Sequence, residues 1–228
     1  MYLARRTWIR RSTVAETTKR LNNPKSGATA LADDPYTHCM HDHSAITIDG
    51  TSSKTSDGPR IRYFAYGSNM LTARLRERVP SATAIGIGQL EGHALRWDKH
   101  SWRDGSGKCD AEYTGQQSDV VWGVVFELDP EDKPALDQAE GLGNGYMEKV
   151  VKILTEAGPI TAVTYLATDK DASLRPYHWY KALVIAGARE HGLPPSYRSR
   201  LELVVTVSDP DPSRASMHNV LGVRATSQ

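Results

Sequence analysis

Residues 61–70 read IRYFAYGSNM, a run that changes from strand-forming to turn-forming residues. The first six residues are mostly aromatic or β-branched, which predicts a β-strand. Gly67, Ser68 and Asn69 follow as a turn, because glycine permits a sharp bend and the two polar side chains can cap a helix. A short helix is expected next, over residues 70–78. The N–H groups of such a turn can bind a carboxylate or phosphate, although many turns of this composition only cap a helix.

The chain beyond this turn has strands in its first part and helices toward its end. Strand composition recurs at residues 82–90, 94–97, 111–114, 120–128, 148–154 and 160–166. Helices are expected from about 130 to 140, from 177 to 191 and from 194 to 203. This order favours the α+β class, with helices flanking a curved, mostly antiparallel sheet.

Composition limits the classes of function. The 228 residues suffice for one sizeable core, and 28 Lys and Arg against 27 Asp and Glu give a net charge of +1. Such a balance gives no reason to expect a nucleic-acid partner. Two cysteines exclude a disulfide framework, and no apolar run approaches the roughly 20 residues that cross a bilayer. We therefore expect a soluble, cytoplasmic protein without a membrane partner.

Residues 1–59 differ from the rest in being rich in polar side chains. We expect a disordered extension, whose basic, acid-poor first part would also suit an organelle transit peptide. Its cluster from His38 to His43 contains metal-ligating side chains, but without a second cluster no metal site is expected. Residues 60–207 are predicted to form the globular domain, and residues 208–228 a C-terminal tail made of a loop and a frayed end.

Glu140 is the leading candidate for acid–base chemistry. It lies four residues after Leu136, so both side chains share one helix face, and a core-facing Leu136 would turn Glu140 inward. Gly141 is expected to end that helix, and the glycines after it suggest a mobile loop. The alternative is a surface glutamate that happens to end a helix.

Trp179, Tyr180 and Cys109 are further candidates for site residues. Trp179 follows the apolar stripe of its helix and is expected to pack in the core, whereas Tyr180 lies on another face and can direct its hydroxyl into a pocket. Cys109 has no histidine nearby in the sequence, so we do not expect it to act as a nucleophile.

Four stretches together resemble the γ-glutamylcyclotransferase family. They are residues 63–70 (YFAYGSNM), 121–125 (VWGVV), 136–141 (LDQAEG) and 180–194, and they occur in the family's order. The resemblance extends over about residues 60–203. It implies a compact, barrel-like α+β fold with a pocket at one end, and release of 5-oxoproline from γ-glutamyl compounds, a reaction of glutathione metabolism.

The resemblance also implies roles for individual residues. Glu140 matches the family's acid/base glutamate. The implied substrate-binding residues are Tyr66, Gly67, Ser68, Asn69, Met70 and Tyr180. Met70 replaces a commoner leucine, and the segment from Trp102 to Cys109 matches no family motif, so it could reshape the leaving-group side of the pocket.

The implied reaction needs few protein groups. The α-amine of the γ-glutamyl unit attacks its own γ-carbonyl, and intramolecular attack supplies much of the rate once the substrate's conformation is held. No metal or organic cofactor is expected. The expected partner is a small γ-glutamyl compound, with a homodimer as an option. The alternatives are a relative specific for glutathione or for γ-glutamylamines, and a non-catalytic protein that binds a γ-glutamyl or carboxylate ligand.

Overall fold

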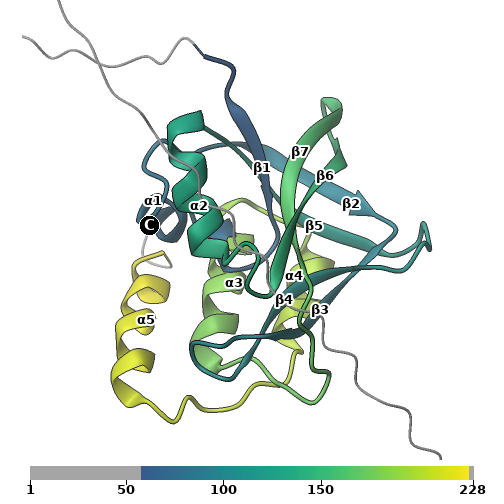
Figure 1. Ribbon diagram of the computed structural model, residues 1–228. Coiled ribbons are helices and arrows are strands. Elements are labelled where there is room, and N and C mark those ends of the chain that lie inside the picture. The colour runs from purple at the N-terminus through teal and green to yellow at the C-terminus, as the bar shows by residue number, and fades with distance from the viewer. Residues whose placement is uncertain (1–57, 226–228) are drawn as a thin grey trace, which may run out of the picture. The chain divides into compact units, whose positions relative to one another are not determined.

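The computed structural model describes residues 58–225, and side chains as far as residue 218. Five strands close into a barrel in the order β1 (Ile61–Ala65), β5 (Val120–Leu128), β2 (Thr83–Glu91), β6 (Tyr146–Thr155) and β7 (Gly158–Ala167). Every neighbouring pair is antiparallel except β1 and β7, which run parallel where Tyr63 lies opposite Val163. The expected α+β class with a barrel-like, mostly antiparallel sheet is confirmed (Figure 1).

A separate hairpin adjoins the barrel. It consists of β3 (His93–His100) and β4 (Gly107–Tyr113), paired antiparallel. The register shifts between Arg96 and Lys99, and such an irregularity can redirect the side chains that follow it. Beyond the shift, Lys99 lies directly opposite Lys108.

Short helical segments flank the barrel (Figure 1). They are η1 (Ser68–Met70), α1 (Thr72–Arg76), η2 (Pro130–Asp132), α2 (Lys133–Glu140), α3 (His178–Glu190), α4 (Pro195–Glu202) and α5 (Pro212–Ala225). None of the helices in the described part of the chain is long and apolar enough to span a membrane.

The core packs α3 closely against the turn after β1. Gly187 of α3 makes this approach possible, because a Cβ at that position would lie 2.5 Å from the backbone nitrogen of Leu71. Phe64 and Phe126 from the barrel, with Leu183 from α3, are fully buried in the same core. Burial of these large side chains anchors the turn that carries residues 67–69.

The single helix expected over residues 70–78 is replaced by η1 and α1, which the extended Leu71 separates. The other strands and helices match the expected ones, apart from end residues, until the C-terminus. There the expectation of a loop and a frayed end is wrong, because residues 212–225 form α5, which packs on α3 (Figure 1). Asp209 stabilises this arrangement, since its carboxylate accepts hydrogen bonds from Arg214 of α5 and from the indole N–H of Trp179 of α3. The expectations for the extension, including the cluster from His38 to His43, concern residues outside the described part.

Candidate active site

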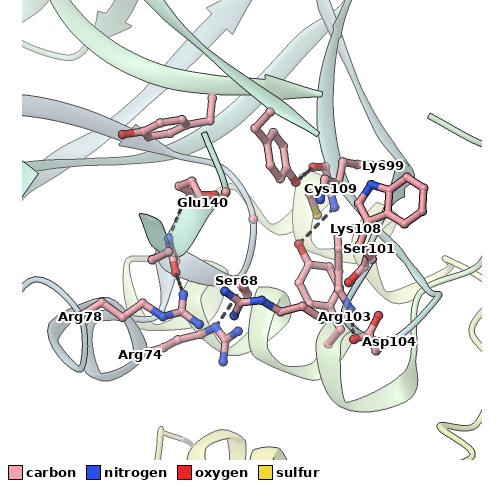
Figure 2. A pocket seen from close by; sticks show the side chains of 18 of the residues that line it. Ser68, Arg74, Arg78, Lys99, Ser101, Arg103, Asp104, Lys108, Cys109 and Glu140 are labelled. Carbon is pink, nitrogen blue, oxygen red and sulfur yellow. Dashed lines mark hydrogen bonds and ion pairs between the residues drawn. The ribbon is translucent and has the colours of Figure 1, made fainter. Parts of the chain in front are cut away.

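A cavity of about 690 Å³ opens beside the turn after β1. Its walls come from the turn itself, α1, the end of α2, the β3–β4 hairpin, α3 and α5, and from one tyrosine each of β1, β6 and β7. Figure 2 shows part of this lining. The sequence-predicted residues among its lining are Tyr66, Gly67, Ser68, Asn69, Glu140 and Tyr180. Segments that are far apart in the sequence therefore meet around one space.

Glu140 reaches this cavity in the manner that the helix spacing predicts. Leu136 is fully buried, one turn earlier on the same face of α2. Gly141 ends the helix in the left-handed conformation, with φ 74° and ψ 45°. The carboxylate oxygen Oε1 of Glu140 accepts a hydrogen bond of 2.6 Å from Nδ2 of Asn69 and one of 2.7 Å from the hydroxyl of Tyr63. The glutamate is thus held against the turn rather than directed into solvent.

Two arginines surround the turn. Nη1 of Arg78 donates to Oδ1 of Asn69 at 3.0 Å, which fixes the amide so that its NH₂ group faces Glu140. Nε of Arg74 donates to the hydroxyl of Ser68 at 3.1 Å. Arg74 is buried, and burial together with the positive charge of Arg78 lowers its pKa to about 10. Both guanidinium groups line the cavity, so the turn lies in a positively charged environment.

Gly67 allows three segments to converge at the cavity. A Cβ at this position would lie 3.2 Å from both the hydroxyl oxygen of Tyr180 and Cβ of Cys109. The hydroxyl of Tyr180 accepts a hydrogen bond of 3.1 Å from the backbone N–H of Cys109. Tyr180 therefore lines the cavity, as expected, and ties α3 to β4.

The other two predicted binding residues occupy different positions. Tyr66 lines the cavity, and its hydroxyl donates to the backbone carbonyl of Tyr165. Met70 is fully buried in the core beside Gly187 and is not among the lining residues. Its long apolar side chain packs under the turn, so the expectation that Met70 contacts substrate is not supported by its position.

Cys109 borders the cavity but is not suited to nucleophilic attack. The residue is buried, and desolvation raises the pKa of its thiol to about 12. Since the thiolate is the reactive form, the thiol remains protonated and inert near neutral pH.

The β3–β4 connection forms one side of the cavity. Ser101, Trp102, Arg103, Asp104 and Lys108 all contribute to the lining. This is the segment that matches no family motif, and the structure places it where it can contact a bound molecule (Figure 2).

The C-terminal helix contributes a wall that the sequence did not reveal. Arg214 and His218 of α5 line the cavity, and the ring of His218 stacks on Trp179 with centroids 4.1 Å apart. Trp179 is buried as expected, yet it also lines the cavity. The residues before α5 have a loop-like composition, with two prolines near Asp209, and this composition predicts a loop there instead of a helix.

Three other lining residues were also missed, although the sequence carries signals for them. In β1, the alternation of side chains along a strand places Tyr63 on the same face as Ala65 and on the face opposite Arg62 and Phe64. Arg74 and Arg78 are four apart and share a helical face. No group of three or more metal-ligating side chains occurs within the described residues.

A family model and solved structures show which class of protein this fold belongs to. A model of the AIG2-like family matches residues 120–201, which include β5, α2 and α3. A solved structure titled γ-glutamyl cyclotransferase superposes with a TM-score of 0.62 at 31% identity, covering 67% of this chain and 92% of that one. YkqA from Bacillus subtilis shares the fold, with a TM-score of 0.56 at 21% identity, covering 66% of this chain and 57% of that one.

Sequence identity to curated relatives then shows to which family this chain belongs. Human γ-glutamylcyclotransferase is 34% identical over 157 residues, which are 65% of this chain and 80% of the relative. The bovine γ-glutamylcyclotransferase is 33% identical over 159 residues, 66% of this chain and 82% of the relative. This chain belongs to the γ-glutamylcyclotransferase family.

Proposed function

We propose that this protein is a γ-glutamylcyclotransferase, which releases 5-oxoproline from γ-glutamyl amino acids or related γ-glutamyl compounds. The observation that carries the proposal is the position of Glu140, whose carboxylate is hydrogen-bonded to Asn69 and Tyr63 at the edge of the cavity. Family membership supports the same reaction, because the relatives carry this name.

The reaction begins with a proton transfer from the substrate. The α-ammonium group must lose a proton before its nitrogen can attack, and a carboxylate is a suitable general base. Oε1 of Glu140 already accepts two hydrogen bonds, whereas none of the described residues donates a hydrogen bond to Oε2. Oε2 is therefore the oxygen that takes the proton.

Ring closure then forms the bond between the α-nitrogen and the γ-carbonyl carbon. The bond from that carbon to the leaving amine breaks, and the proton held by Glu140 passes to the leaving nitrogen. The ring nitrogen releases a second proton as it becomes the lactam N–H, and the freed amine takes up that proton to leave as an ammonium, so the protons balance. Glu140 thus serves first as base and then as acid. Because nucleophile and electrophile belong to one molecule, holding the folded-back conformation supplies much of the acceleration.

The turn after β1 is suited to holding the negative charges of the glutamyl unit. The first hydrogen bond within η1 runs from the N–H of Met70 to the carbonyl of Gly67, so the N–H groups of Ser68 and Asn69 precede it and are available to a ligand. Arg74 and Arg78 add two positive charges beside them. A carboxylate, and the oxyanion that develops at the γ-carbon, are both stabilised by such donors.

A non-catalytic γ-glutamyl-binding protein is the alternative. A pocket that only held an anion would gain nothing from a carboxylate at its edge, because like charges repel. Glu140 is oriented by two donors at that edge, which favours catalysis.

A panel of three substrates tests the proposal. Purified protein is incubated with γ-glutamyl-alanine, glutathione or γ-glutamyl-lysine, and 5-oxoproline is quantified by mass spectrometry. We expect turnover of γ-glutamyl-alanine. Turnover of glutathione or γ-glutamyl-lysine alone would indicate one of the specialised relatives, and saturable binding without any product would indicate the non-catalytic alternative.

A further inference from the structure

The cavity has a surplus of positive charge. Among its lining residues, the acids are Asp104 and Glu140, and the Lys and Arg residues are Arg74, Arg78, Lys99, Arg103, Lys108 and Arg214. Two of these cations are neutralised within the protein, Lys108 by Asp104 at 2.8 Å and Arg214 by Asp209. The other four have no carboxylate within 4.0 Å among the described residues. A ligand with several negative charges would balance them.

Lys99 is the most unusual of these cations. It is only 7% exposed, and its ammonium group lies 4.6 Å from the centre of the Tyr146 ring without a carboxylate partner. Burial lowers its pKa, although the charges of Glu140 and Asp169 oppose this shift. A buried ammonium group is costly unless it is paired, so its position at the cavity indicates an anion that arrives with a ligand.

The pairing of β3 with β4 strengthens this interpretation. Lys99 and Lys108 are direct register partners, and like charges that face each other across two strands repel. Asp104 neutralises only Lys108. Arg103, from the connection between the two strands, adds a third positive charge to the same wall. Figure 2 shows Lys99 and Lys108 across the cavity from Glu140, and the side chain of Arg103 extending from the hairpin toward Ser68.

The four cations without a carboxylate partner fall into two pairs, one bonded to the turn after β1 and one carried by the β3–β4 hairpin. Arg74 and Arg78 are bonded to Ser68 and Asn69 of the turn, where the glutamyl unit is proposed to bind. Lys99 and Arg103 belong to the hairpin, which carries no part of that turn. Two unpaired cations are thus left for the leaving group, whereas a simple amino acid brings only one carboxylate.

We infer that the substrates of this protein are γ-glutamyl derivatives of acidic amino acids, with the side-chain carboxylate of the leaving group bound by Lys99 and its α-carboxylate bound by Arg103. This inference rests on the proposed function and specifies its substrate class. A leaving group with one carboxylate leaves one of these cations unbalanced. An amine without a carboxylate leaves both unbalanced.

The test compares two substrates that differ by one charge, γ-glutamyl-glutamate and γ-glutamyl-glutamine. We expect kcat/KM for 5-oxoproline release to be about tenfold or more higher for the glutamate compound, because one charge-assisted contact is lost with the amide. Equal values for the two compounds, with γ-glutamyl-alanine also turned over, would overturn the inference and leave the proposed function intact. Absence of product from all three would refute the proposed function itself.

Substitutions at Lys99 test whether this residue is responsible for the preference for γ-glutamyl-glutamate over γ-glutamyl-glutamine. In Lys99→Met we expect the ratio of the two kcat/KM values to fall toward one, and in Lys99→Arg we expect it to be largely kept. Lys149→Met is the matched control, since Lys149 is exposed on β6 away from the cavity and its loss changes the net charge equally. An equal loss on both substrates in Lys99→Met would place Lys99 on a group that the two substrates share, rather than on the side-chain carboxylate, and would overturn the inference. Circular dichroism verifies that each variant is folded.

Discussion

The hydroxyl of Tyr63 lies 2.7 Å from Oε1 of Glu140, and this contact joins the first strand of the barrel to the last residue of α2. Asn69 donates to the same oxygen from the turn that follows β1. With two donors on one oxygen, the carboxylate has a fixed orientation at the cavity, and no described residue donates to its other oxygen. The strand, the turn and the helix therefore position the proposed acid/base group together.

Tyr63→Phe removes one of these two donors with little change in shape. We expect kcat to fall about ten- to a hundredfold, since a hydrogen bond to a charged group contributes roughly 1.5–3 kcal/mol. Steady-state release of 5-oxoproline from γ-glutamyl-alanine measures the effect. Tyr113→Phe is the control, because Tyr113 is 73% exposed and outside the cavity lining. A Tyr63→Phe enzyme with unchanged kcat would show that this contact does not orient Glu140 for catalysis.

Leu136→Ala tests the packing that turns α2 toward the cavity. The side chain of Leu136 is fully buried, so its truncation should lower the free energy of unfolding by about 2–5 kcal/mol. Urea denaturation gives the value. Leu203→Ala, at a position that is 81% exposed, should change it by less than about 0.5 kcal/mol. Similar losses in the two variants would mean that Leu136 does not anchor the helix.

Asp209→Asn tests how α5 is held. Hydrogen bonds from Arg214 hold the pKa of the Asp209 carboxyl well below its usual range. A lowered pKa stabilises the fold at neutral pH, and this stabilisation is lost as the pH falls below the unfolded value of about 4. We therefore expect wild type to exceed Asp209→Asn in unfolding free energy at pH 6, with the difference shrinking toward pH 2.

Urea unfolding at several pH values measures that difference. Glu156→Gln is the control, because Glu156 is an exposed carboxylate in the turn between β6 and β7. A wild-type advantage that stayed constant from pH 6 to pH 2 would be inconsistent with an ionised Asp209 holding α5.

The thiol of Cys109 should be unreactive in the folded protein. With its pKa raised to about 12 from an ordinary value of 9.0, its thiolate fraction at pH 8 is about a thousandfold lower. In a Cys39→Ser variant, which leaves Cys109 as the single thiol, alkylation by iodoacetamide should be very slow until denaturant is added. Rapid labelling of the folded variant would contradict the buried position of Cys109.

Local patterns were sufficient to predict much of the fold. The turn at residues 67–69, the helix that brings Leu136 and Glu140 to one face, and the strand at residues 120–128 all follow from spacing and residue type. Barrel closure was expected from family resemblance, since no local pattern specifies that β1 pairs with both β5 and β7.

The parts that were missed depend on tertiary contacts. The helix α5 is joined to α3 through Asp209, Arg214 and the stacking of His218 on Trp179, none of which its own composition indicates. Lys99 lies just beyond the strand expected at residues 94–97, and nothing local indicates that the opposing strand buries it after the register shift. Contacts between side chains that are far apart in the chain cannot be predicted from local patterns in a single sequence.

The most direct measurement compares wild type with Glu140→Gln in 5-oxoproline release from γ-glutamyl-alanine, followed by mass spectrometry. Glutamine keeps the size of the side chain and an oxygen that can accept from Asn69 and Tyr63, but it cannot take up the proton. We expect at least a hundredfold loss of kcat, with an unchanged unfolding midpoint in urea. Turnover by Glu140→Gln close to that of wild type would contradict the assignment of Glu140 as the acid/base group.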